Sequence, residues 1–133
     1  YEAIALKRIG WLYDQLGDYE RANKHFFMAL AIEEKLFSKH EMARTYGLIS
    51  WCFEHQSNRE QALKFASMGL ELMKQVNDKA GIAYMYNLLG MIDYAQFEYE
   101  RALHYIDSAL HIRRLLAQEV ATASTLENIA LVY

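Results

Sequence analysis

The side chains best suited to chemistry in this sequence are five histidines, one cysteine and a few neighbouring carboxylates. His104, Asp107 and His111 lie at i, i+3 and i+7, so a helix would present three metal-ligating groups on one face. The spacing matches no zinc signature, and the sequence supplies no matched fourth ligand. We therefore expect a solvated helix face here, with no bound metal or other cofactor.

Nucleophilic and acid–base catalysis are no better supported. Cys52 occupies a position that is apolar wherever the sequence repeats itself, which predicts a buried structural thiol. Glu33 and Glu34 are consecutive, so their carboxylates do not converge, and we expect them on a solvated helix face. Neither G-x-S-x-G nor H-E-x-x-H occurs in the sequence. We expect no catalytic residues in this chain and no enzyme activity.

An internal repeat of forty residues supplies the elements that position these side chains. Tyr19-Glu20-Arg21-Ala22 returns eighty residues later as Tyr99-Glu100-Arg101-Ala102. Alanine opens every unit, at Ala3, Ala43, Ala83 and Ala123. We expect one domain, 1–133, made of units 1–38, 39–78 and 79–118 and a partial fourth unit, 119–133.

Each unit has the periodicity of two helices. In the first unit, Leu6, Ile9, Gly10 and Tyr13 fall at i, i+3, i+4 and i+7, which is one face of a helix. The second half of the unit shows the same spacing. We expect helices near 2–16, 19–37, 39–56, 59–76, 79–96, 99–117 and 119–133.

Short turns connect the predicted helices. Gly17 is suited to end one helix in a left-handed conformation, and Asp18 is suited to cap the next. Ser38 and Glu41 have the spacing of a capping box. Phe97 stands where the first unit has Gly17, and a left-handed conformation is costly for phenylalanine, so the third turn is expected to differ.

The repeated residues resemble the tetratricopeptide repeat signature W-x2-L-G-x2-Y followed by A-x3-F. The first unit has Leu6-x2-Ile9-Gly10-x2-Tyr13 and then Ala22-x3-Phe26, and the third unit has Tyr86-x2-Leu89-Gly90. The resemblance covers the whole chain and implies an all-α, right-handed superhelical solenoid of antiparallel helix pairs. The period exceeds the standard ~34 residues. It is similar to the long repeats of kinesin light chains, spindle-orientation adaptors and bacterial signalling proteins.

The resemblance also implies a function, because such solenoids bind proteins on a concave face that the first helix of each pair lines. We expect a protein or peptide partner there, in a scaffold or regulatory domain of a larger protein. Another alternative is the sensor part of a bacterial signalling regulator or phosphatase. The expected partner-binding residues are Lys7, Arg8, Trp11, Asp14, Arg44, Leu48, Trp51, Glu54, His55, Tyr84, Asn87, Met91 and Asn128.

Trp11, Trp51 and Met91 occupy equivalent positions, so they are expected to form a ladder across neighbouring helices. Basic residues precede this ladder by one helical turn and acidic residues follow it. One hypothesis is that the ladder binds an apolar or amphipathic segment, such as a partner helix. The alternative is that both tryptophans pack against neighbouring helices and only support the solenoid.

A competing hypothesis is self-association. Leu126, Ile129 and Tyr133 lie on the side of the last predicted helix that a following helix would cover. The sequence also begins with Tyr1 rather than methionine, so we expect a piece of a longer array. Apolar solenoid ends predict either further repeats or a structural module that forms homo-oligomers through these ends.

Composition excludes two classes of partner. The chain has 17 acidic and 14 basic residues, a net charge of −3, so it lacks the basic surface that nucleic acids and anionic membranes attract. No apolar run approaches the ~20 residues of a membrane span. A single cysteine cannot form an internal disulfide, and we expect a cytoplasmic protein.

Overall fold

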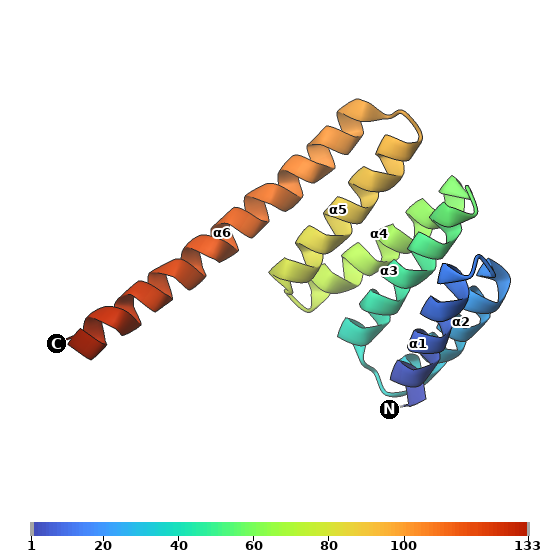
Figure 1. Cartoon of the computed structure of the whole chain (residues 1–133), viewed down its shortest axis with the longest axis horizontal. Helices are drawn as coiled ribbons and strands as arrows, with labels where there is room; N and C mark the ends of the chain where they lie inside the picture. The colour runs from blue at the N-terminus through green and yellow to red at the C-terminus, as the bar shows by residue number, and fades with distance from the viewer. Residues whose placement is uncertain (1, 133) are drawn as a thin grey trace.

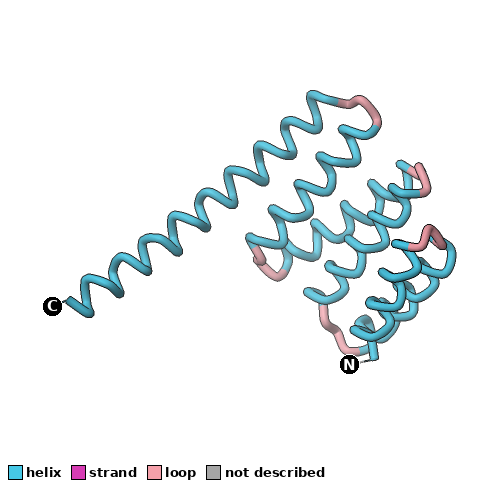
Figure 2. The backbone as a smooth tube through the Cα atoms, viewed as in Figure 1, coloured by secondary structure: helices cyan, strands magenta, loops and turns pink. Residues whose placement is uncertain are grey.

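The computed structural model describes the backbone of residues 2–132 and the side chains of residues 2–119. All regular structure within this range is α-helical, and short turns join the helices (Figure 2). The helices are α1 (Glu2–Gln15), α2 (Tyr19–Lys35), α3 (Lys39–His55), α4 (Arg59–Gln75), α5 (Lys79–Ala95) and α6 (Tyr99–Val132).

The six helices form three antiparallel pairs that stack in chain order (Figure 1). Helix α1 pairs with α2, α3 with α4, and α5 with α6, while α2 contacts α3 and α4 contacts α5 across the pair boundaries. The all-α array of helix pairs that the sequence predicts is therefore confirmed.

Small residues let the two helices of a pair approach closely. A Cβ atom on Gly10 would lie 2.7 Å from the ring of Phe26 on α2. A Cβ atom on Gly90 would lie equally close, 2.7 Å, to Ile106 on α6. Substitution by alanine at either position would force these neighbours to move.

All five turns place one residue in the left-handed region. Gly17 has φ +81° in the first turn. Phe97 has φ +64° at the equivalent position, so the prediction that its turn differs is wrong. The amide of Phe97 donates to the Tyr94 carbonyl, and the amide of Glu98 donates to the Asp93 carbonyl, as in a Schellman motif. The other residues with positive φ are Phe37, Ser57 and Asn77.

The N-terminal caps follow the sequence with one exception. Ser38 precedes α3, but its side chain makes no capping hydrogen bond, so the predicted capping box with Glu41 is wrong. The Glu41 carboxylate lies 3.0 Å from Lys7 Nζ instead. The side chains that do cap their helices are Asp18, Asn58 and Asp78.

Helix α6 corrects the predicted boundary at residue 118. Helices were expected at 99–117 and 119–133, whereas α6 runs without a break from Tyr99 to Val132. The first two units each end in a turn, at Phe37-Ser38 and at Asn77-Asp78, in which Phe37 and Asn77 have positive φ. Ala117-Gln118 consists of helix-forming residues without a cap. The second half of α6 therefore extends beyond the other helices (Figure 1).

Candidate functional site: a groove across the first helices

A groove of about 970 Å³ crosses the first helices of the three pairs. Helices α1 and α3 supply most of its lining, the start of α5 closes one side, and Met73 comes from α4. Six of the predicted partner-binding residues line it: Lys7, Arg8, Trp11, Arg44, Leu48 and Tyr84.

Apolar side chains from two helices are open to solvent in this groove. On α1, Trp11 is 51% exposed and lies two helical turns from Ile4 and next to Leu12, and both of these residues are exposed as well. Tyr84 on α5 is 42% exposed. An exposed apolar cluster of this kind is uncommon on a surface that has no partner.

The two tryptophans are not equivalent in the structure. Trp51 is only partly exposed and packs against the core formed by α3, α4 and α5. Its ring lies 5.6 Å from that of His55 and it does not line the groove. The supporting role fits Trp51, whereas Trp11 keeps half of its surface in solvent.

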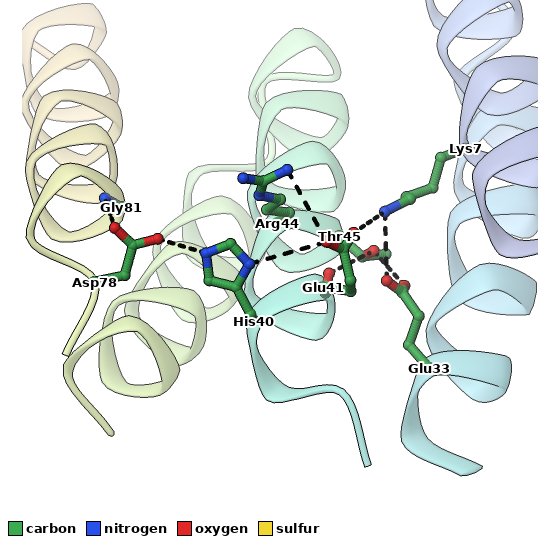
Figure 3. A network of polar contacts seen from close by, with 8 residues as sticks. All are labelled: Lys7, Glu33, His40, Glu41, Arg44, Thr45, Asp78 and Gly81. Atoms are coloured by element: carbon green, nitrogen blue, oxygen red, sulfur yellow. Dashed lines mark hydrogen bonds and ion pairs between the residues drawn. The ribbon is translucent and has the colours of Figure 1, made fainter. Parts of the chain in front are cut away.

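A network of ion pairs and hydrogen bonds lies along one side of the groove (Figure 3). Lys7 Nζ on α1 lies 3.0 Å from Glu41 Oε2 on α3 and 3.4 Å from Glu33 Oε2 on α2. The Thr45 hydroxyl donates to the other oxygen of Glu33 at 2.5 Å. Three helices are thus joined through one carboxylate that is 2% exposed.

The same network continues to the third pair. Figure 3 shows His40 between Glu41 and Asp78, with Nε2 2.5 Å from Asp78 Oδ2 and Nδ1 3.9 Å from Glu41 Oε1. The other Asp78 oxygen accepts the amide of Gly81 at the start of α5. The network therefore connects α1, α2, α3 and α5 along one side of the groove.

Burial and hydrogen bonds shift the pKa values of the three carboxyl groups in opposite directions. Burial raises the pKa of Glu33, and the hydrogen bond from Thr45 and the charge of Lys7 only partly offset it. The hydrogen bond from Lys7 lowers the pKa of Glu41. The Gly81 amide, followed by His40, lowers the pKa of Asp78.

Positive charge remains at the groove once these carboxylates are paired. Arg8 is exposed and forms no ion pair within the described residues, and Arg44 reaches Glu41 only at 4.0 Å. Glu41 and Asp78, the two acidic residues in the lining, are already bound to Lys7 and His40. The groove thus offers an apolar wall with two guanidinium groups beside it.

Solved structures with the same arrangement of helices are tetratricopeptide-like repeats. The TPR domain of Arabidopsis FLU superposes with a TM-score of 0.76 at 22% identity, covering 87% of this chain and 96% of that domain. A putative kinesin light chain of Podosopora anserina with nearly identical TPR-like repeats gives 0.73 at 12% identity, covering 86% and 57%. This chain has a TPR-like fold.

A third similar structure is BtubC (BKLC) from P. vanneervenii, with a TM-score of 0.75 and 23% identity over 84% of this chain. The chain spans 46% of the length of BtubC. No family model and no curated protein matches this sequence. The likeness is therefore one of fold.

Several predicted residues lie elsewhere on the TPR-like array. Asp14 was expected on an exposed acidic rim, but its carboxylate is buried and lies 2.9 Å from His55 Nδ1, so that expectation is wrong. Asn87 donates to the sulfur of Met91 at 3.6 Å, outside the groove. The predicted residues that do not line the groove are Asp14, Trp51, Glu54, His55, Asn87 and Met91.

Four predicted residues cannot be placed at the groove or at an end face. Asn128 belongs to the expected groove, and Leu126, Ile129 and Tyr133 belong to the expected end face. All four lie outside the residues whose side chains are described.

Most of the polar network was not predicted from the sequence. His40 and Thr45 were assigned to no site. The expectation of a solvated face is wrong for Glu33, which is buried because it follows Phe26 by seven residues and so lies on the inward face of its helix. A charged residue on an inward face was the available signal. The groove residues that were also missed are Leu12, Glu41, Met73, Asp78, Ala80 and Gly81.

The residues considered for catalysis take ordinary structural positions. Cys52 is buried as expected, its thiol donates to the Tyr19 carbonyl at 3.4 Å, and burial raises its pKa to about 12. His104 and His111 are exposed on α6. The side chains described here contain no cluster of three or more potential metal ligands. Across the described range, no helix is both long and apolar enough to traverse a bilayer.

Proposed function

We propose that this chain is a protein-interaction module that binds an apolar or amphipathic peptide or helix in the groove. The observation that carries the proposal is the exposure of Trp11 at the centre of an apolar wall. Tryptophan that is exposed in a free protein and central to a concave surface is typical of binding hot spots.

The charges beside the wall support a partner of defined polarity. Arg8 and Arg44 favour carboxylates on the polar side of the bound segment, because the groove's own carboxylates are already paired with Lys7 and His40. We therefore propose that the partner is an amphipathic segment with one apolar face and acidic residues next to it.

The cellular setting is part of the same proposal. We propose a non-catalytic scaffold or regulatory domain of a larger cytoplasmic protein, without cofactors and without nucleic-acid or membrane partners. The unpaired, buried thiol of Cys52 supports a reducing compartment.

Peptide selection with matched variants tests this proposal. Peptides selected from a random library on the purified chain are expected to be amphipathic and acidic. Trp11→Ala should weaken their binding about fivefold or more, which is roughly 1 kcal/mol. Leu36→Ala is the control, because Leu36 is exposed immediately after α2 and lies outside the groove. If no peptide is selected, or if the selected peptides bind the Trp11 variant unchanged, the proposal is wrong.

Self-association is the second candidate function. It is supported by exposed apolar side chains on α6 that no described element covers, including Leu103 and Leu110. This activity and peptide binding use different surfaces, so each can be removed without the other.

A further inference from the structure

Helix α6 carries an apolar stripe beside the face that packs against α5, and Ile106 lies where the stripe meets that face. Leu103, Ile106 and Leu110 lie at i, i+3 and i+7 and are 62%, 36% and 42% exposed. Their counterparts eighty residues earlier include Phe26 and Leu30, which are 1% and 6% exposed. Those counterparts belong to the core between α2 and α3. The α6 stripe therefore has the position of an inter-repeat packing surface, and no other described helix serves as its covering helix.

The length of α6 identifies what that covering helix is. Helices α2, α3, α4 and α5 have 17 residues each, whereas α6 has 34. Its second half, 119–132, corresponds in the repeat to the first helix of a pair, the element that covers the stripe position elsewhere. Because α6 is continuous, this half points away from the stripe of its own chain (Figure 1).

We propose that two copies of this chain exchange these arms, residues 119–132, so that each arm covers the α6 stripe of the other copy. The two α6 helices would lie antiparallel, with a two-fold axis near Ala117-Gln118. Exchange of an identical element in this way is a low-cost route to a symmetric dimer.

The internal repeat interface supplies the register of this pairing. Thr45 on α3 donates to Glu33 on α2. The residues eighty positions later are Thr125 and Arg113, so we expect Thr125 of one arm to lie opposite Arg113 on the α6 helix of the other copy. These equivalent positions are centred within a few residues of Ala117.

A second internal contact gives nearly the same centre. Cys52 on α3 donates to the carbonyl of Tyr19 on α2. The residues eighty positions later are Val132 and Tyr99, so the same correspondence places Val132 opposite Tyr99. The two pairs have their midpoints at 119 and 115.5, on either side of Ala117, so an antiparallel pair centred near Ala117 places both sets of equivalent positions close together, once in each half. This agreement is what an isologous dimer requires.

Charge favours the same pairing. The arm contains Glu119 and Glu127 and has no lysine or arginine between 119 and 133. The receiving half of α6 ends in Arg113-Arg114, and both arginines are exposed. Antiparallel pairing brings the acidic start of one arm to the basic end of the other stripe.

Cysteine cross-linking tests the arm exchange directly. The variant Arg113→Cys with Thr125→Cys is expected to give disulfide-linked dimers on oxidation, seen as a doubled mass on non-reducing gels. Native Cys52 is buried and has a raised pKa, so it should not compete. A disulfide within one chain would show that the arm folds back, and no disulfide would show that it covers no stripe. Either result overturns the proposal.

A turn substitution provides the second test. Ala117→Asn with Gln118→Asp copies Asn77-Asp78 and should let the arm fold back onto its own stripe. Light scattering should then fall from twice 15.6 kDa to 15.6 kDa, and the disulfide should become intramolecular. The control is His111→Asn, because its equivalents Ala31 and Glu71 are exposed in the other pairs. A turn variant that stays dimeric would contradict arm exchange.

The inference goes beyond peptide binding and gives a geometry to the second candidate function. Neither Ala117 nor Gln118 lines the groove, so the turn variant should bind selected peptides like the native chain. Loss of the dimer and loss of peptide binding are therefore separate outcomes.

Discussion

The groove and the α6 stripe are both apolar and open to solvent, yet they occupy different positions in the repeat. Ile106 and Leu110 of the stripe correspond to Phe26 and Leu30, which are buried between consecutive helices. Trp11 corresponds to Trp51 and Met91, which remain partly or largely exposed in the other pairs. The stripe position is thus buried between helices in the first repeat, whereas the Trp11 position keeps exposed surface in every pair, although Trp51 also packs against the core.

The surroundings of the two surfaces differ as well. An ion-pair network across four helices lies beside the groove, and Arg8 and Arg44 are exposed at its edge. Among the described side chains of residues 99–110 on α6, only Arg101 forms an ion pair with another helix, through Asp93 on α5. Ordered charges favour selective recognition of a partner, whereas a bare apolar stripe favours simple burial.

The largest expected effect is a loss of stability when the polar network along the groove is broken. Lys7→Met leaves the buried Glu33 carboxylate without its cation and should lower the free energy of unfolding by about 3 kcal/mol at neutral pH. Urea denaturation followed by circular dichroism measures this change. Arg8→Met is the control, because Arg8 is exposed and should change stability little. Equal stabilities of the two variants would contradict a structural role for the network.

A crossed pair of substitutions sharpens the distinction between the surfaces. Trp11→Ala should weaken peptide binding by about 1–2 kcal/mol and leave the mass in solution unchanged. Leu110→Glu should abolish the dimer and leave peptide binding unchanged, because a charge would be buried in the exchanged interface. Isothermal titration calorimetry and light scattering on both variants check this. If either substitution affects both properties, the two surfaces are not independent.

Substitutions in the turns should have a smaller effect on the free energy of unfolding. Phe97 is exposed and has φ +64°, so Phe97→Gly should raise the free energy of unfolding by about 1 kcal/mol. Gly17→Ala is the matched reverse change and should lower it by a similar amount, because Gly17 has φ +81°. Thermal denaturation of both variants measures the shifts, and a destabilised Phe97 variant would show that its side chain has a packing role.

The smallest expected effect is a pH dependence at Glu33. Its pKa is raised in the folded chain, so its contribution to stability is complete below the ordinary pKa of about 4.3 and is lost as pH rises through the folded value. Relative to Glu33→Gln, the native chain should therefore lose stability as pH rises from about 4 towards neutrality. Urea titrations across this range test the sign, with the exposed Glu34→Gln as control.

Glu41 and Asp78 should show the opposite sign. The pKa values of both are lowered, so their contributions are present above the ordinary carboxyl pKa and are lost as pH falls through the folded values. A Glu33 effect with the same sign as these two would contradict its burial.

Much of the fold was predictable, because the forty-residue repeat specifies the helix pairs, and Gly17, Asp18 and Asp78 specify turns and caps. The failures have two origins, one in the backbone of a turn and one in a contact between helices. Phe97 adopts a left-handed conformation because the Schellman hydrogen bonds around it outweigh its local preference. Glu41 contacts Lys7 rather than completing a capping box.

The candidate site was predictable only in part. Helical geometry brought Trp11, Arg8 and Arg44 to one face, because side-chain direction follows the helical period. The pairing of Asp14 with His55, and of Lys7 with Glu33, joins residues 41 and 26 positions apart. No local spacing specifies such contacts, so they depend on how the helix pairs pack.

The most direct test of the binding surface uses the fluorescence of Trp11 alone. In a Trp51→Phe variant, Trp11 is the only tryptophan and is half exposed in the free chain. Saturation with a selected peptide should shift its emission to shorter wavelength and protect it from quenching by acrylamide, because the peptide removes the ring from water. A peptide that binds with full affinity while the emission and quenching of Trp11 stay unchanged would contradict the groove as the binding site.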